Sequence, residues 1–129
     1  MRIFKTRDFA RFARKEGIDD AALCEAIARA ERGLVDAALG GGLIKQRVPR
    51  KGRGRSGGFR TIVAYRRGDR AFFMYGFAKS ERDNIADDEL AAIKTTARLL
   101  MSQRSDKLAA ALKDKKIEEV MCNDDEVQE

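Results

Sequence analysis

The sequence contains no histidine and no tryptophan among its 129 residues, and it has a single proline. Without histidine, the chain cannot form Ser–His or Cys–His nucleophilic triads, nor zinc sites that depend on imidazole. Any acid–base chemistry near neutral pH must therefore use Lys, Arg, Tyr, Asp, Glu or water.

Cysteine is scarce too: Cys24 and Cys122 are far apart, and neither belongs to a CxxC or CxxH motif. Metal binding is not indicated, and reduced thiols are the default expectation. No apolar run approaches the roughly 20 residues of a membrane helix. The first residues, "MRIFKTRDF", lack the apolar block of a signal peptide. We therefore expect a cytoplasmic protein without a membrane segment or a metal site.

Positive charge is concentrated in one part of the chain. The net charge is +6, but residues 43–82 carry 12 basic and 2 acidic side chains, whereas residues 117–129 carry 6 acidic side chains and no basic one. The stretch "RVPRKGRGRSGGFR", residues 47–60, holds six Lys and Arg, four glycines and no acid. Such a block favours binding of a nucleic acid, and a merely solvated loop is the alternative.

Hydrophobic patterning predicts one α+β domain over residues 1–116, followed by an acidic tail, 117–129, with a short strand and then disorder. We expect two N-terminal helices and further C-terminal helices, all packed on a small, mostly antiparallel sheet. The expected strands are 1–6, 42–48, 59–66, 71–79 and 116–122. The expected helices are 8–16, 19–33, 87–103 and one that begins at Ser105. Apolar residues on both faces of 59–66 and 71–79 indicate central strands.

The segment "GRSGGFRTIVAYRRGDRAFFMYGFAKSERDNI", residues 54–85, resembles the RelE/HigB branch of the RelE/ParE toxin superfamily. In that family a K-x-GG-[YF]-R segment leads a strand, and a hairpin, an F-x-K-x-[ER]-R strand end and a C-terminal helix follow. The resemblance implies a RelE-like fold and a bacterial type II toxin that cleaves messenger RNA on the ribosome and so arrests translation and growth. It also implies a cognate antitoxin, expected to be a helix-turn-helix protein, and no metal or organic cofactor.

The implied reaction is attack by a ribose 2′-hydroxyl on the adjacent phosphate. It needs a base, cations that stabilise the phosphorane, and an acid for the leaving 5′-oxygen. Arg60 matches the arginine that the family places after its basic loop, and we expect it to contact the phosphate. Lys51 is the better candidate base because the pKa of lysine is more easily lowered than that of arginine. Lys79 and Arg82 match the basic pair of the family. Further RNA contacts are expected from Arg47, Arg50, Arg53, Arg55 and Arg66.

The chain departs from the family pattern at two positions. Ser80 stands where some members have arginine, and Ala86 stands where they have tyrosine. The sequence therefore does not assign the general acid or the general base to particular residues. Of the two tyrosines present, Tyr65 is the preferred substitute because its strand also carries Arg60. Packing is the alternative role for both Tyr65 and Tyr75.

Two other functions fit the same composition. One is the sister activity of the superfamily, poisoning of DNA gyrase without any cleavage. The other is a nucleic-acid-binding module unrelated to toxins. Convergence of Arg60 with Lys79 and Arg82 favours the nuclease, because a phosphate site needs cations that meet in space.

Overall fold

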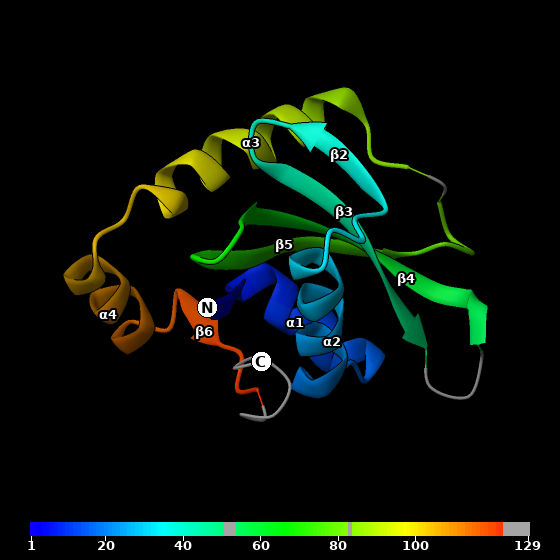
Figure 1. Cartoon of the computed structure of the whole chain (residues 1–129), viewed down its shortest axis with the longest axis horizontal. Helices are drawn as coiled ribbons and strands as arrows, with labels where there is room; N and C mark the ends of the chain where they lie inside the picture. Colours follow the sequence, from blue (N-terminus) through cyan, green and yellow to red (C-terminus); the bar gives the residue numbers. More distant parts are fainter. Residues whose placement is uncertain (51–53, 83, 123–129) are drawn as a thin grey trace.

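The computed structural model describes residues 1–50, 54–82 and 84–122, with only the backbone for 54–57. A six-stranded sheet of order β2-β3-β4-β5-β1-β6 separates helices α1 and α2 from α3 and α4 (Figure 1). The elements are β1 (Arg2–Thr6), α1 (Arg7–Glu16), α2 (Asp20–Glu31), β2 (Ala37–Gly40), β3 (Leu43–Arg50), β4 (Gly54–Arg66), β5 (Arg70–Ala78), α3 (Asp87–Met101), α4 (Ser105–Lys113) and β6 (Ile117–Glu119). Among the described strands, only β1 and β5 pair in parallel, so the expected mostly antiparallel α+β fold is confirmed.

The two N-terminal helices begin and end where local chemistry predicts. The hydroxyl of Thr6 accepts the N–H of Phe9 and caps α1, and a carboxylate oxygen of Asp19 accepts the N–H of Ala22 and caps α2. Helix α1 ends at Gly17, whose φ of 70° lies in the left-handed region that glycine adopts without strain. These two helices cover one side of the sheet, called here the α1/α2 face.

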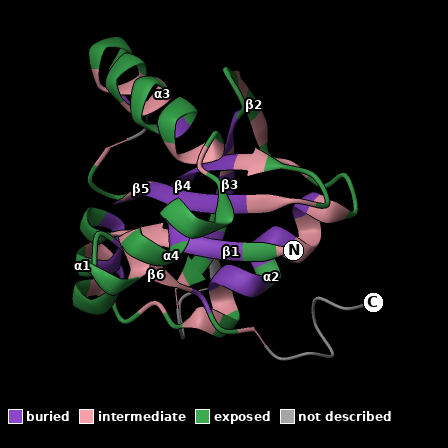
Figure 2. Cartoon of the chain, turned by 90° about the vertical axis from the view of Figure 1, so that its left-hand side faces the viewer, coloured by how far each residue is buried: buried purple, intermediate pink, exposed green. Residues whose placement is uncertain are grey.

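The opposite side is the α3/α4 face, and the central strands are buried between the two. On β4, Ile62 and Ala64 belong to the core under α3 and α4, while Phe59 and Val63 belong to the core under α1 and α2. Figure 2 shows the buried residues gathered in these strands, whereas the outer surface of α3 is exposed. Strands β4 and β5 are therefore central, as expected.

A close helix–sheet contact fixes α1 on β5. A Cβ added at Gly76 would lie 2.4 Å from Cε2 of Phe12, far inside van der Waals contact. The ring of Phe12 also packs edge-on to Phe59, with 5.6 Å between centroids. Glycine at position 76 is therefore needed for the helix to reach the sheet.

The sheet is larger than the sequence suggests. Strand β2 was not expected, because the region up to the glycines 40–42 reads as helical. Strand β3 continues through Pro49 to Arg50, with a register shift between Val48 and Arg50 that accommodates the missing donor. Strand β4 begins at Gly54, so part of the expected basic loop is strand.

The end of the described chain is bound to its beginning. Strand β6 pairs with β1 as the expected edge strand, Arg2 contacts Glu119 at 2.9 Å, and Arg14 contacts Glu118 at 3.1 Å. These two acids therefore face the N-terminal elements and not the basic stretch. The rest of the expected disordered tail, 123–129, lies outside the described residues.

The expectation of reduced cysteines is wrong in this structure. Cys24 of α2 and Cys122 form a disulfide with 5.8 Å between their Cα atoms. The sequence separation of 98 residues gave no signal of this pairing, because the two meet only after β6 has docked beside β1. In the described part of the chain, no helix has both the length and the apolar character that crossing a bilayer requires.

Candidate nucleic-acid site

Arg60 places an unsatisfied cation on the α3/α4 face. Side chains alternate along a strand, so Arg60 shares the face of Ile62, which lies in the core under α3. Its Nη1 is buried and has no hydrogen-bond partner among the residues that the structure describes. A buried, unpaired donor on a charged group costs free energy that an anionic ligand would recover.

The residues that lie opposite Arg60 on the adjacent strands further favour binding of an anion. On one side it lies directly opposite Arg47 of β3, and on the other side opposite Phe77 of β5. Like charges directly opposite each other in a sheet are destabilising. The positive charge of Arg47 is partly compensated by the carboxylate of Asp36, with 3.6 Å between Nε of Arg47 and Oδ1 of Asp36.

Arg82 reaches the same place from beyond the end of β5. Its guanidinium carbon lies 5.5 Å from the ring centroid of Phe77, a cation–π contact, and Phe77 is the residue directly opposite Arg60 on β5. Lys79 is exposed and stays in register with β4, because its N–H bonds to the carbonyl of Gly58 at 3.4 Å. The register of β4 and β5, together with the contact of Arg82 with Phe77, thus brings Arg60, Lys79 and Arg82 to one end of the sheet.

Arg82 is held by a network of hydrogen bonds. Its Nη2 donates to Oε1 of Glu89 at 2.7 Å, its Nη1 donates to the hydroxyl of Tyr75 at 3.2 Å, and its Nε donates to the carbonyl of Asn84 at 2.9 Å. The hydrogen bond from Arg82 lowers the pKa of Glu89, and the same bond raises the pKa of Arg82. Both groups are therefore charged at neutral pH.

Tyr65 lies elsewhere, although it shares a strand with Arg60. They are five positions apart, and an odd difference in position places their side chains on opposite faces. Tyr65 packs against the core under α1 and α2, and its hydroxyl bonds to Glu31. Burial, together with this bond, raises its pKa. The expectation that Tyr65 stands beside Arg60 is therefore wrong.

Tyr75 is the tyrosine on the α3/α4 face. It pairs in register with Ile62, two positions from the Arg60–Phe77 pair, and it packs against the core under α3. Its hydroxyl also lies 3.5 Å from Oε2 of Glu89. The sequence did not single out Glu89, which is the third residue of α3.

The remaining expected RNA-binding cations are dispersed. Arg50 lies on the α1/α2 face, over the ring of Phe59 at 5.4 Å and 3.8 Å from Glu16. Arg66 shares the face of Arg60 but is six residues further along β4, or about 20 Å away. There it pairs with Asp69 at 2.8 Å.

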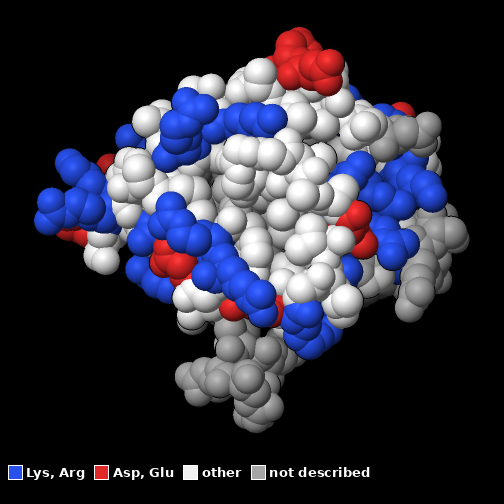
Figure 3. Space-filling model, turned by 45° about the horizontal axis from the view of Figure 1, so that its top comes forward, with Lys and Arg blue, Asp and Glu red and all other residues white. Residues whose placement is uncertain are grey.

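Three expected site residues lie outside what the structure describes. Lys51 and Arg53 fall in the undescribed segment, and the side chain of Arg55 is likewise undescribed. On the side of the molecule that carries α3, Figure 3 shows Lys and Arg in several separate groups around a largely uncharged centre. On this side of the molecule, the described cations therefore do not form one continuous basic surface.

Comparison with known proteins identifies the family. A search among curated proteins finds no match to this sequence. A family model described as "RelE toxin of RelE / RelB toxin-antitoxin system" matches residues 1–120, which include every described strand and helix. The matched region therefore includes both the sheet and the cluster of Arg60, Lys79 and Arg82. The chain belongs to the RelE toxin family of toxin–antitoxin systems.

Proposed function

We propose that this toxin is a metal-independent endoribonuclease that cleaves messenger RNA on the ribosome, in the bacterial cytoplasm. The observation that carries the proposal is the buried Nη1 of Arg60, which lacks a partner among the described residues. A second arginine, Arg82, lies over the ring of Phe77, the residue directly opposite Arg60 on β5. Arginine offers planar, paired donors that match phosphate oxygens. A ribose–phosphate linkage of RNA has the negative charge and the arrangement of oxygens that these donors match.

The cations have distinct roles in the proposed reaction. The 2′-oxygen attacks phosphorus, and negative charge accumulates on the non-bridging oxygens as the P–O5′ bond weakens. Arg60 donates to these oxygens from a fixed position on a central strand, which costs no reorganisation at the moment of reaction. Lys79 and Arg82 add positive charge at the same end of the sheet. Lys51 remains the proposed base for the 2′-hydroxyl.

Membership of the family implies a cognate antitoxin as partner. We propose that this antitoxin is a helix-turn-helix protein, and that messenger RNA and the ribosome are the toxin's other partners. Arg47, directly opposite Arg60, would contact a neighbouring phosphate. Arg66 would contact RNA at the far end of β4. Arg50, Arg53 and Arg55 are proposed contacts around the glycine-rich stretch.

Induced expression in growing bacteria tests this function. We expect wild-type toxin to stop incorporation of labelled amino acid while incorporation of labelled thymidine continues at first. Arg60→Ala should relieve the arrest, since loss of one donor to the transition state costs about 100- to 1000-fold in rate. Arg67→Ala is the matched control, because it removes an arginine from the turn that follows β4 without touching the cluster.

Gyrase poisoning predicts the opposite order of events. Thymidine incorporation would then stop first, and messenger RNA would remain intact. Equal arrest by wild type and Arg60→Ala would also contradict the nuclease, because the proposed phosphate contact would have no role.

A further inference from the structure

Tyr75 has the position and the partners of a proton donor. We propose that Tyr75 is the general acid for the leaving 5′-oxygen, and that Arg82 and Glu89 are positioning residues that hold its hydroxyl. This role rests on the RNA cleavage proposed above. It supplies a hydroxyl at the site although Ala86 occupies the position where some family members carry tyrosine.

The first support is the location of Tyr75 relative to Arg60. The pairs Arg60–Phe77 and Ile62–Tyr75 are two positions apart on the same face, so Arg60 and Tyr75 are diagonal neighbours. Diagonal positions lie about 7–8 Å apart, within reach of long and aromatic side chains. A phosphate held by Arg60 therefore lies within reach of the Tyr75 hydroxyl.

The second support is the charge next to the phenolic oxygen. Arg82 Nη1 donates to this oxygen at 3.2 Å, so a positively charged group lies next to the atom that gives up the proton. Arg82 already donates to Glu89 and to the carbonyl of Asn84. Because all three guanidinium nitrogens of Arg82 already donate hydrogen bonds within the protein, Arg82 is better suited to positioning Tyr75 than to binding the phosphate itself.

The third support is the way in which Glu89 locks Arg82. The two carboxylate oxygens of Glu89 accept from the two terminal nitrogens of Arg82, at 2.7 and 3.3 Å, and Oε1 also accepts the N–H of Ala86 at 3.1 Å. Glu89 is thus fixed to the first turn of α3. Such a bidentate pair, anchored on a helix, holds the guanidinium in one orientation.

One bond to phosphorus forms and one breaks in the proposed step. The 2′-oxygen forms a bond to phosphorus and gives its proton to the base, while the bond between phosphorus and the 5′-oxygen breaks. The hydroxyl proton of Tyr75 moves to the 5′-oxygen. The products are a 2′,3′-cyclic phosphate and a 5′-hydroxyl, and the Tyr75 phenolate regains a proton from water.

Tyr75→Phe is the first test, because it removes the hydroxyl and keeps the ring that packs against Phe77 at 6.2 Å between centroids. With purified toxin and programmed ribosomes, we expect cleavage to slow by about 100-fold or more, the usual contribution of a general acid. Tyr65→Phe, the same change on the opposite face, should keep the wild-type rate. Circular dichroism spectra of all variants check that the fold is retained.

A modified message separates proton donation from a structural role. A thiolate leaves without a proton because thiols are far more acidic than alcohols. On a message whose cleaved linkage carries sulfur in place of the 5′-oxygen, Tyr75→Phe should therefore cleave at nearly the wild-type rate. Glu89→Gln should slow cleavage of the normal message, and the sulfur linkage should relieve that loss as well.

The outcomes distinguish this inference from the function on which it rests. If wild-type toxin cleaves no message, the proposed function fails. If wild type cleaves and Tyr75→Phe cleaves equally fast, or if its loss persists undiminished on the sulfur linkage, Tyr75 is not the general acid and this inference is overturned. If Glu89→Gln retains the wild-type rate, the positioning role of Glu89 is refuted.

Discussion

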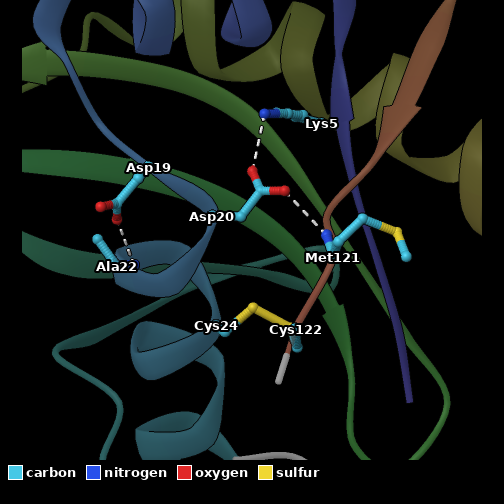
Figure 4. The surroundings of a disulfide bond; sticks show 7 residues. All are labelled: Lys5, Asp19, Asp20, Ala22, Cys24, Met121 and Cys122. Carbon is cyan, nitrogen blue, oxygen red and sulfur yellow. Dashed lines mark hydrogen bonds and ion pairs between the residues drawn. A yellow bond between two sulfur atoms is a disulfide. The ribbon is translucent and has the colours of Figure 1, made fainter. Parts of the chain in front are cut away.

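Reduction of the disulfide between Cys24 and Cys122 should weaken the fold by a measurable amount. Figure 4 shows the bond joining α2 to the segment that follows β6, next to Asp20, which bonds both Lys5 and the N–H of Met121. The bond closes a loop between residues 98 positions apart. Loop-closure entropy for that length corresponds to about 4.7 kcal/mol at 25 °C.

The measured loss should be about 2–5 kcal/mol, because native disulfides in small domains usually contribute in that range. Other contacts keep β6 in place after reduction, among them the hydrogen bond from Val120 N–H to the carbonyl of Ile3 at 2.8 Å. We therefore expect reduced toxin to remain folded, with a midpoint of thermal unfolding lower by about 7–18 °C.

Guanidinium unfolding of the wild type with and without a thiol reductant measures this difference. The Cys24→Ala/Cys122→Ala double variant is the control: its stability should match that of the reduced wild type and should not respond to reductant. If the wild type and the double variant respond equally, or if thiol titration of the untreated wild type finds two free thiols, the disulfide does not contribute as calculated.

Three further predictions concern stability. Gln46 is buried; its side-chain nitrogen donates to the carbonyls of Ala26 and Leu34, and its side-chain oxygen accepts the N–H of Asp36. Gln46→Leu leaves these groups without partners and should lower the free energy of unfolding by about 2–4 kcal/mol in denaturant titrations. Gly76→Ala should cost about 1–3 kcal/mol through its clash with Phe12, and Phe12→Leu in the same chain should recover part of that loss. The hydrogen bond from Arg82 lowers the pKa of Glu89 from its ordinary 4.5. The ionised Glu89 carboxylate therefore contributes its full stabilisation above pH 4.5, and this stabilisation is lost as the pH falls through the lowered pKa. Unfolding midpoints between about pH 5 and 3 should therefore fall more steeply in the wild type than in Glu89→Gln.

Local patterns predicted the elements whose signals lie within a few neighbouring residues. The cap at Thr6, the glycine after α1 and the apolar residues on both faces of β4 all act over one or two turns or over alternate positions. For this reason the helices and the central strands could be placed from the sequence. Strand β2 was missed because it has only four residues, three of them alanine or glycine, and forms a strand through pairing with β3.

The site was predictable in part. The pairing of β4 with β5, which a hairpin pattern indicates, was enough to bring Arg60 close to Lys79. Strand alternation could also have excluded Tyr65, since an odd separation from Arg60 places it on the other face. Tyr75 is harder to assign, because Met74 is an extra residue on β5 between the pairs Ile62–Tyr75 and Val63–Phe73 and interrupts the alternation there.

Glu89 and the disulfide depend on tertiary geometry that no local pattern encodes. Glu89 reaches Arg82 only because the chain turns back between β5 and α3, and its position in the first turn of α3 suggests an ordinary helix-start acid. Cys122 reaches Cys24 only because β6 docks at the edge of the sheet. Both pairings follow from the fold and cannot be read from residue spacing.

The central claim is that Arg60 stabilises the phosphate at which RNA is cut, and primer extension on a translated message tests it most directly. With purified toxin and ribosomes, the wild type and Arg67→Ala should produce the same new 5′ ends within the coding sequence, and Arg60→Ala should produce them about 100- to 1000-fold more slowly. An intact message with wild-type toxin, or equal cleavage by Arg60→Ala, would contradict the claim.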